Sequence, residues 1–292
     1  VHITNGAKYN TFDGNIIKSN LTTSSNGRAF VIYAGALSEY NTVSNNSIIG
    51  GYYSMYIYGT SSTSWAKGNV IKDNDISGFY YYGMMVYYQD SVQVVGNYIH
   101  DGLNTTQYGI YSYYCYDAFN FSDNKIVLSA SNYSYGLRVY YCNYNNNSTA
   151  LGIVANNMVS ITAGTGTNYG LYAYYSNNTY FINNSINIEV GGTSSRALYQ
   201  YNTTTGTGMY FKNNNFVTKA GYAAYFGTPA AIAYQDYNNY YSTGTYFVYY
   251  SGNKTDLAGL QTASSKETNS VSVNPGYLSA TDLHASAVGI DA

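Results

Sequence analysis

The chain has 292 residues, of which 45% are hydrophobic, 18% aromatic and only 9% charged, and its formal net charge is −2. A charge this close to zero argues against nucleic acid and anionic membranes as partners, because both select basic surfaces. No apolar run reaches the roughly eighteen residues of a membrane helix, so we expect no membrane insertion.

A tyrosine-rich segment recurs along most of the chain. Its clearest copy, residues 169–174, reads Tyr-Gly-Leu-Tyr-Ala-Tyr. We call the apolar third residue of each copy the anchor. The anchors are Phe30, Met55, Met84, Ile110, Leu137, Leu171, Leu198, Ala224 and Phe247. Repeats at this spacing indicate a solenoid, in which each repeat stacks on its neighbours.

A second motif lies between the tyrosine segments and shares their period. It reads apolar, any, any, Asn, any, apolar, and its asparagines are Asn15, Asn46, Asn74, Asn97, Asn124, Asn156, Asn184 and Asn214. We expect these side chains to stack along the solenoid axis and to hydrogen-bond to one another. Asparagine also tolerates the left-handed backbone of a sharp corner, which favours a turn between two short strands here.

The alternation of an Asn-Asn-x-Ile turn with a Tyr-Gly-Leu strand resembles the right-handed parallel β-helix superfamily. Pectate lyases, polygalacturonases, phage tailspikes and many microbial surface proteins share that coil. The resemblance implies an all-β, single-stranded parallel β-helix (solenoid) of about nine rungs over residues 1–250. Residues 251–292 form a connector and closing segment. The composition of residues 251–271 indicates a polar connector or a short helix around 257–263, and the tail resembles the C-terminal closing segment that covers the last rung in many surface β-helices. The fold hosts enzymes, adhesins and spacers, so it does not decide the activity.

Side chains alternate along a strand, so the residues one and three places after each anchor should point outward. We call this outer surface the tyrosine face. Its unbroken column is Tyr33, Tyr58, Tyr87, Tyr113, Tyr140, Tyr174 and Tyr201. A second column contains Tyr56, Tyr111, Tyr172, Tyr199 and Tyr225, interrupted by Val31, Met85 and Arg138. The inward positions are apolar, except for Ser112 and Gln200.

Three interpretations of the tyrosine face stay open. Tyrosine forms strands well and stacks on itself, so the columns could serve the fold alone. The face could pack against another copy of the chain, because so large an aromatic patch is unusual on a monomer. It could also bind a polysaccharide, because aromatic rings stack on sugars. We expect Arg138 to stack on its aromatic neighbours.

Cys115 and Cys142 each follow their anchors by five residues, so we expect them to lie in adjacent rungs. We predict a disulfide between them, with two stacked reduced thiols as the alternative. The three histidines, His2, His100 and His284, are far apart in the sequence. No spacing predicts a metal site, and we expect no cofactor.

The resemblance to pectinases raises the question of catalysis. The best local acidic group is Asp73 and Asp75 with His100 and Asp101 one rung on, and Asp73 shares a turn column with Asp123 two rungs away. None of the pectinase motifs is present, and turn aspartates usually cap local backbone. We therefore predict no enzymatic activity, with a polysaccharide lyase or hydrolase as the alternative.

The predicted function is structural or adhesive. Few lysines and glutamates, and many Asn-x-Ser/Thr triplets, favour an extracellular or cell-surface location. We expect a homo-oligomer or filament that assembles laterally through the tyrosine face or end to end, because a parallel coil leaves unpaired strand edges. A polysaccharide-binding protein is the alternative.

Overall fold

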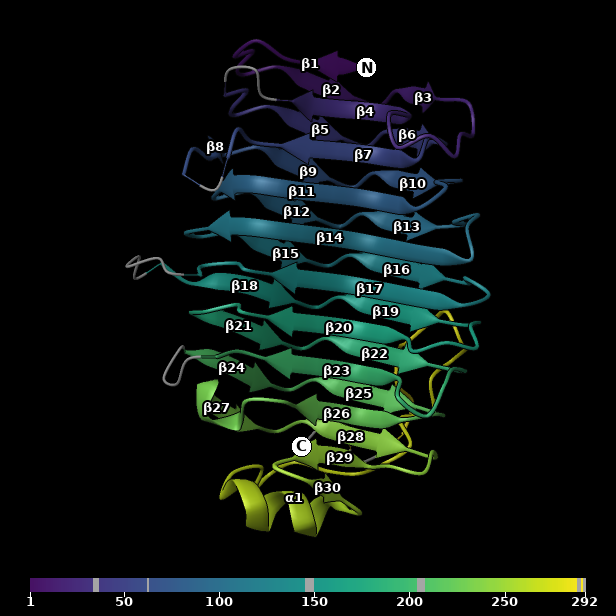
Figure 1. Cartoon of the computed structure of the whole chain (residues 1–292), viewed down its shortest axis with the longest axis vertical. Coiled ribbons are helices and arrows are strands. Elements are labelled where there is room, and N and C mark those ends of the chain that lie inside the picture. Colours follow the sequence, from purple (N-terminus) through teal and green to yellow (C-terminus); the bar gives the residue numbers. More distant parts are fainter. Residues whose placement is uncertain (34–36, 62, 145–149, 204–207, 288–289, 291–292) are drawn as a thin grey trace.

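The computed structural model describes residues 1–33, 37–61, 63–144, 150–203, 208–287 and 290. The chain coils into a parallel β-solenoid in which each turn lies below the previous one (Figure 1). Three sheets run along the rod, one of twelve strands and two of nine. The expected all-β solenoid of about nine rungs is confirmed.

The twelve-stranded sheet, sheet A, carries the tyrosine segments. Its strands are β1 (His2–Ile3), β4 (Arg28–Tyr33), β7 (Tyr53–Tyr58), β8 (Ala66–Lys67), β11 (Tyr82–Asp90), β14 (Thr106–Tyr116), β17 (Tyr133–Tyr140), β20 (Tyr169–Tyr174), β23 (Arg196–Tyr201), β26 (Tyr222–Phe226), β29 (Val248–Tyr250) and β30 (Asn253–Lys254). All pairs are parallel except β29 with β30.

The two nine-stranded sheets flank the asparagine turns. Sheet B contains β2 (Thr11–Asp13), β5 (Thr42–Ser44), β9 (Val70–Lys72), β12 (Gln93–Val95), β15 (Asn120–Ser122), β18 (Gly152–Ala155), β21 (Thr179–Ile182), β24 (Met209–Lys212) and β27 (Ile232–Asp236). Sheet C contains β3 (Ile16–Lys18), β6 (Ser47–Ile49), β10 (Asp75–Ser77), β13 (Tyr98–His100), β16 (Lys125–Leu128), β19 (Met158–Ile161), β22 (Ser185–Ile188), β25 (Asn215–Thr218) and β28 (Asn239–Ser242).

The register of sheet A follows the predicted anchors. Each anchor from Phe30 to Leu198 lies opposite the next one, and all of them are fully buried. The last predicted anchor is wrong by one residue, because Ala224 pairs with Val248 and not with Phe247. The two polar inward residues are also buried: Ser112 donates to the carbonyl of Arg138 at 2.9 Å, and Gln200 accepts from the amide of Thr228 at 3.3 Å.

The glycine that precedes the anchor allows sheet A to approach sheet C. A Cβ added to Gly136 would lie 2.2 Å from Cγ1 of Val159 and 2.6 Å from the carbonyl oxygen of Gly170. Real Cβ atoms do not come so close to such neighbours, so this position accepts only a very small residue. The glycine of the Tyr-Gly-Leu pattern is therefore explained by the close contact between sheets A and C.

Asparagines form a hydrogen-bonded ladder between sheets B and C. Each Nδ2 donates to Oδ1 of the asparagine on the next turn at 2.9–3.0 Å, in the order Asn15, Asn46, Asn74, Asn97, Asn124, Asn157, Asn184, Asn214 and Asn238. The predicted member Asn156 is wrong. Asn156 occupies the preceding position, where φ is 56°, so the left-handed corner belongs to the residue before the ladder.

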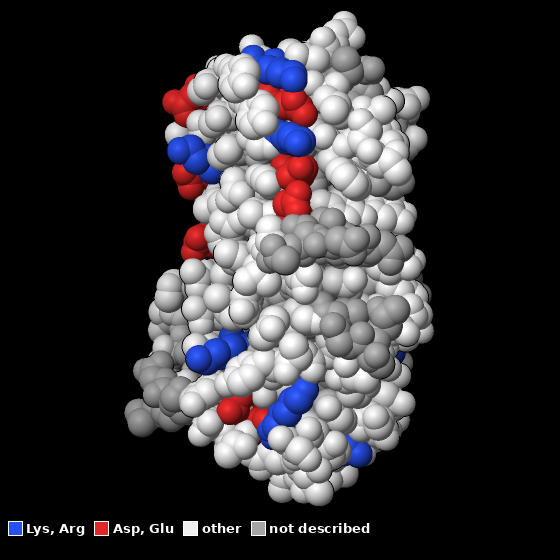
Figure 2. Space-filling model, turned by 90° about the vertical axis from the view of Figure 1, so that its left-hand side faces the viewer, with Lys and Arg blue, Asp and Glu red and all other residues white. Residues whose placement is uncertain are grey.

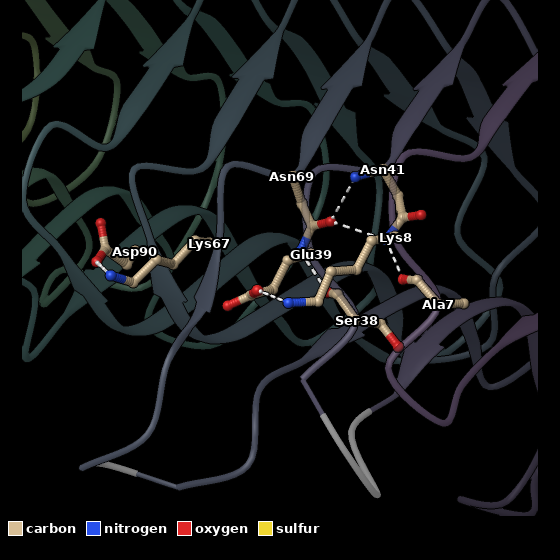
Figure 3. Close-up of polar contacts among 8 residues, drawn as sticks. All are labelled: Ala7, Lys8, Ser38, Glu39, Asn41, Lys67, Asn69 and Asp90. Atoms are coloured by element: carbon tan, nitrogen blue, oxygen red, sulfur yellow. Dashed lines mark hydrogen bonds and ion pairs between the residues drawn. The ribbon is translucent and has the colours of Figure 1, made fainter.

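A second, shorter amide ladder lies near the N-terminal end of the rod (Figure 3). Nδ2 of Asn41 donates to Oδ1 of Asn69 at 3.3 Å, and Asn69 in turn donates to Gln89 at 2.9 Å. Two ion pairs lie beside it, Lys8 with Glu39 at 2.6 Å and Lys67 with Asp90 at 3.9 Å. Figure 2 shows blue and red atoms close together near the N-terminal end of this side of the molecule, and further blue and red atoms toward the C-terminal end.

The C-terminal end of the rod is covered by helix α1 (Leu257–Ser264), close to the predicted helix. Asp256 caps it by accepting from the amide of Gly259 at 2.8 Å. The tail then turns back along sheet C, where Asn239 and Val273 exchange two hydrogen bonds and Ser160 donates to the carbonyl of Ala280. Of the predicted closing segment, residues 288–289 and 291–292 lie outside the described residues. Within the described ranges, no helix is long and apolar enough to cross a membrane.

Candidate binding face

The tyrosine columns predicted from the sequence lie in register on the outer surface of sheet A. Tyr33, Tyr58, Tyr87, Tyr113, Tyr140, Tyr174 and Tyr201 each pair with the next member of their column. The column of Val31, Tyr56, Met85, Tyr111, Arg138, Tyr172, Tyr199 and Tyr225 runs beside it and continues to Tyr249.

A third column at the start of the strands was not predicted. It contains Arg28, Tyr53, Tyr82, Tyr108, Tyr135, Tyr169, Arg196 and Tyr222. Strict alternation from the anchor places this residue inward, but the glycine position after it is itself buried. Two successive inward residues break the alternation and turn the first residue outward. The signal was present in the sequence, because Arg28 and Arg196 would otherwise lie in the core.

A fourth set of tyrosines directly follows the unbroken column, within β11 and β14 and just after β17 and β20. Tyr88, Tyr114, Tyr141 and Tyr175 all have positive φ values, between 51° and 54°. Successive rings of this set stack at 4.7–5.7 Å between centroids. A left-handed backbone is uncommon for a tyrosine and costs free energy. The same four residues, on four consecutive rungs, stack their rings on one another.

The rings of a column cover one another. In the third column, Tyr82, Tyr108, Tyr135 and Tyr169 stack at 4.5–5.0 Å with interplanar angles of 22° or less. Tyr140 and Tyr174 stack at 4.8 Å and 27°. Because neighbouring rings occupy each ring's faces, the edges and hydroxyl groups are the parts left for solvent or for a ligand. The face is therefore less apolar than its composition suggests.

The columns are packed closely enough to bury part of the outer surface. Val31, Tyr56 and Met85 form a small cluster there and are only 7–8% exposed. Burial raises the pKa of Tyr82 and of Tyr172 well above the usual range, and raises the pKa of Tyr199 to about 12. These phenols therefore stay protonated, and stay hydrogen-bond donors, at physiological pH.

Three arginines are set into the columns. The Arg138 guanidinium lies 4.3 Å from the ring centroid of Tyr140 and 4.4 Å from that of Tyr111, so the predicted stacking is confirmed. Arg28 lies 4.3 Å from Tyr56, and Arg196 lies 4.4 Å from Tyr225. Such contacts contribute about 0.5–2 kcal/mol each, depending on how far the cation is desolvated.

The family model described as the right handed beta helix region matches residues 1–150, slightly more than half of the chain. The chain belongs to the right-handed β-helix family. No curated protein and no solved structure matches it significantly.

The right-handed β-helix family includes proteins with and without catalytic activity, so the acidic group predicted around His100 must be assessed from its geometry. His100 lies between two carboxylates, with Nε2 at 2.9 Å from Asp75 and Nδ1 at 2.8 Å from Asp101, and it stacks on Tyr98. Asp73 lies at the left-handed corner before β10, outside these ion pairs. Within the described residues, no group of three or more His, Cys, Asp or Glu side chains is arranged to hold a metal ion.

The β-helix stacks Cys115 and Cys142 in adjacent rungs, but the predicted disulfide is wrong, because both thiols are free and fully buried. Residues in register on parallel strands point the same way and are separated by the strand spacing of about 4.8 Å. A disulfide needs Cβ atoms about 3.8 Å apart. Cys115 instead contacts the carbonyl of Val86 at 3.6 Å, and burial raises its pKa.

Proposed function

We propose that this right-handed β-helix is a non-catalytic, extracellular adhesive protein and that the tyrosine face is its binding surface. One observation carries the proposal: an ordered, outward lattice of phenol groups runs along the rod and contains three arginines that form no ion pair with an acidic residue in the described part of the chain. A fold stabilised by strand propensity alone has no need of arginines at these positions.

Absence of catalysis is part of the same proposal. The His100 group consists of a partly buried histidine and two exposed aspartates, and both ring nitrogens of the histidine already contact a carboxylate. A histidine held in this way is suited to joining β10 to the following rung.

Lateral self-assembly through the same face is the competing proposal. Two tyrosine faces placed against each other would bring arginines together without carboxylates to balance them, and this disfavours a homotypic contact. End-to-end growth is disfavoured as well, because α1 lies over the C-terminal end of the coil.

A pair of double variants tests the face. Tyr140→Thr with Tyr174→Thr removes two stacked rings from sheet A and keeps strand propensity. Tyr180→Thr with Tyr210→Thr removes a stacked pair from sheet B, where the centroids are 4.4 Å apart. Binding is measured on immobilised polysaccharides, and assembly by sedimentation velocity.

We expect the wild-type chain to bind at least one polysaccharide as a monomer. The sheet A variant should lose at least tenfold in affinity, and the sheet B variant should bind like wild type. Equal binding by both variants would show that the face is not the binding surface. Concentration-dependent assembly that only the sheet A variant abolishes would favour the competing proposal.

A further inference from the structure

We propose that the ligand of the tyrosine face is an anionic polysaccharide, a linear glycan with carboxylate or sulfate groups that lies along the rod. The proposal rests on the proposed function and names the ligand class for that surface. It is carried by the charge of the face, by the state of its phenols and by the spacing of its cations.

Among the described residues, the arginines of the face have no acidic partners. Asp90 is the only acidic residue in the strands of sheet A, and it lies 3.9 Å from Lys67. The ion pairs of the described residues all involve lysine or histidine, so none uses Arg28, Arg138 or Arg196. The face is therefore positive within a chain whose net charge is −2.

The same arginines have buried polar atoms that no hydrogen bond compensates. Nε of Arg28, of Arg138 and of Arg196 is buried without a hydrogen-bond partner. Arg196 donates once, from Nη1 to the hydroxyl of Tyr169 at 2.8 Å. A guanidinium stacked among rings and left without a counterion favours the arrival of an anion, because charge-assisted hydrogen bonds are the strong ones.

The surface between the cations suits a ligand rich in hydroxyl and ether oxygens. Burial raises the pKa of Tyr108 and of Tyr113 above the usual range, so these phenols remain donors throughout the physiological range. Ring faces are occupied by neighbouring rings, so hydrogen bonds from the hydroxyl groups are the main contacts the columns can offer. A sugar chain has acceptors all along its length.

Charge spacing argues against a nucleic acid. Arg138 and Arg196 lie two strands apart in sheet A, about 10 Å along the rod, and Arg28 lies four strands from Arg138, about 19 Å. Duplex DNA has one charge per about 1.7 Å, far denser than these cations. A glycan whose acidic groups are separated by neutral atoms matches the spacing better.

An acidic peptide is also disfavoured. Peptides that bind along sheets usually add a strand at an exposed edge. Strands β4 to β26 of sheet A each pair on both sides, so the tyrosine face offers no such edge. An extended acidic peptide remains one of the outcomes that the experiment can detect.

Three polymers with one backbone test the charge requirement: dextran, carboxymethyl-dextran and dextran sulfate. Binding is measured with the full chain by biolayer interferometry, with poly-glutamate and duplex DNA as further probes. We expect at least one of the two charged dextrans to bind at least tenfold more tightly than dextran, and binding to weaken as salt is added. The carboxymethyl and sulfate polymers distinguish the two sources of negative charge.

Variants locate the binding. Arg138→Gln with Arg196→Gln should weaken binding of the charged dextran at least tenfold. Lys18→Gln with Lys72→Gln removes the same charge from exposed positions on sheets C and B, and should leave binding unchanged. Tyr140→Phe with Tyr174→Phe keeps the stacked rings, removes two donors and should cause a several-fold loss. If the arginine variant does not fold, the three dextrans and the salt dependence of wild-type binding still show whether the ligand must be anionic.

Each other result overturns the inference. If neutral and charged dextrans bind equally, and this binding depends on Tyr140 and Tyr174, the ligand need not be anionic. The tyrosine face would then still be the binding surface. Preference for poly-glutamate or DNA over both charged dextrans would replace the glycan by another polymer. If the Arg138/Arg196 variant binds the charged dextrans as tightly as wild type does, the charged groups of the polymer must contact another part of the protein. If the chain binds none of these probes, the inference is wrong. The proposed function would then be tested only by the binding measurements on immobilised polysaccharides.

Discussion

The hydroxyl of Tyr240 donates a 2.6 Å hydrogen bond to Oε1 of Glu267, at the point where the coil meets its C-terminal cover. Asn238, the last asparagine of the ladder, donates to the other carboxyl oxygen at 3.3 Å, and Ser270 donates to the same oxygen. The carboxyl group is fully buried, and no lysine or arginine of the described residues forms an ion pair with it.

Glu267 should make the C-terminal cover sensitive to pH. Burial raises its pKa from the ordinary 4.5 to about 7, against the opposing effect of its three donors. Because the folded value is the higher one, its contribution to stability is complete below pH 4.5 and is lost as pH rises through 7. The full difference is about 3 kcal/mol. Hydrogen exchange of residues 257–271 between pH 5 and 8.5, corrected for intrinsic rates, should show loosening at the alkaline end.

Two variants check the assignment of this pH dependence. Glu267→Gln cannot ionise, so its exchange should be flat over the same window. Glu189→Gln is the control, because Lys219 and Asn187 lower the pKa of Glu189, and its contribution therefore falls only in acid. Loosening that persists in Glu267→Gln would assign the effect to another group, of which Asp236 and Lys266 are the nearest charged ones.

Removing one amide from the asparagine ladder should be costly. Asn124 is buried, accepts from Asn97 and donates to Asn157 and to the carbonyl of Val94. Asn124→Ala leaves these groups unpaired, and we expect a loss of about 2–4 kcal/mol in the free energy of unfolding. Denaturant titration measures it. Asn156→Gly is the matched control: it removes an exposed amide at a left-handed position that glycine accepts, so it should change stability by about 0.5 kcal/mol or less.

The glycine before the anchor should not tolerate a methyl group. In Gly136→Ala the new Cβ would meet Val159 and the backbone of Gly170, so sheets A and C must separate locally. We expect a loss of about 1–3 kcal/mol, measured as a lower midpoint in thermal or denaturant unfolding. Ala197 follows Gly170 in the same register, and Ala197→Gly should cost only about 1 kcal/mol. A stable Gly136→Ala variant would show that the contact between the sheets is loose.

The two cysteines should be reduced in the native protein. Alkylation in denaturant without a reductant should add two labels by intact mass, and the folded chain should react slowly because both thiols are inaccessible. Cys115→Ser and Cys142→Ser should each remain folded. Recovery of an unlabelled, oxidised chain would contradict the free thiols and restore the predicted disulfide.

The sequence alone predicted much of this architecture and only part of the candidate site. Periodicity fixed the anchors from Phe30 to Leu198 and two tyrosine columns, because equivalent residues must stack in a parallel coil. It missed the third column, since the kink at the glycine breaks strict alternation. It chose Asn156 over Asn157 because the flanking apolar pairs 153–154 and 158–159 fit the motif in two frames that differ by one residue. The disulfide failed because residues stacked in adjacent rungs are about 4.8 Å apart, wider than the Cβ separation of about 3.8 Å that a disulfide needs.

The asparagine ladder has a direction, since every Nδ2 points toward the C-terminal end and every Oδ1 toward the N-terminal end. Any interior turn therefore presents the same acceptor above and the same donor below. Duplicating or deleting one whole interior turn would keep the hydrogen-bond pattern of the ladder, and the two end turns are the exceptions, because the ladder starts at Asn15 and ends against Glu267. Insertion or deletion of whole repeats in the gene would therefore lengthen or shorten the rod while the C-terminal cover stays the same. The length of the rod can thus change in evolution without a new fold.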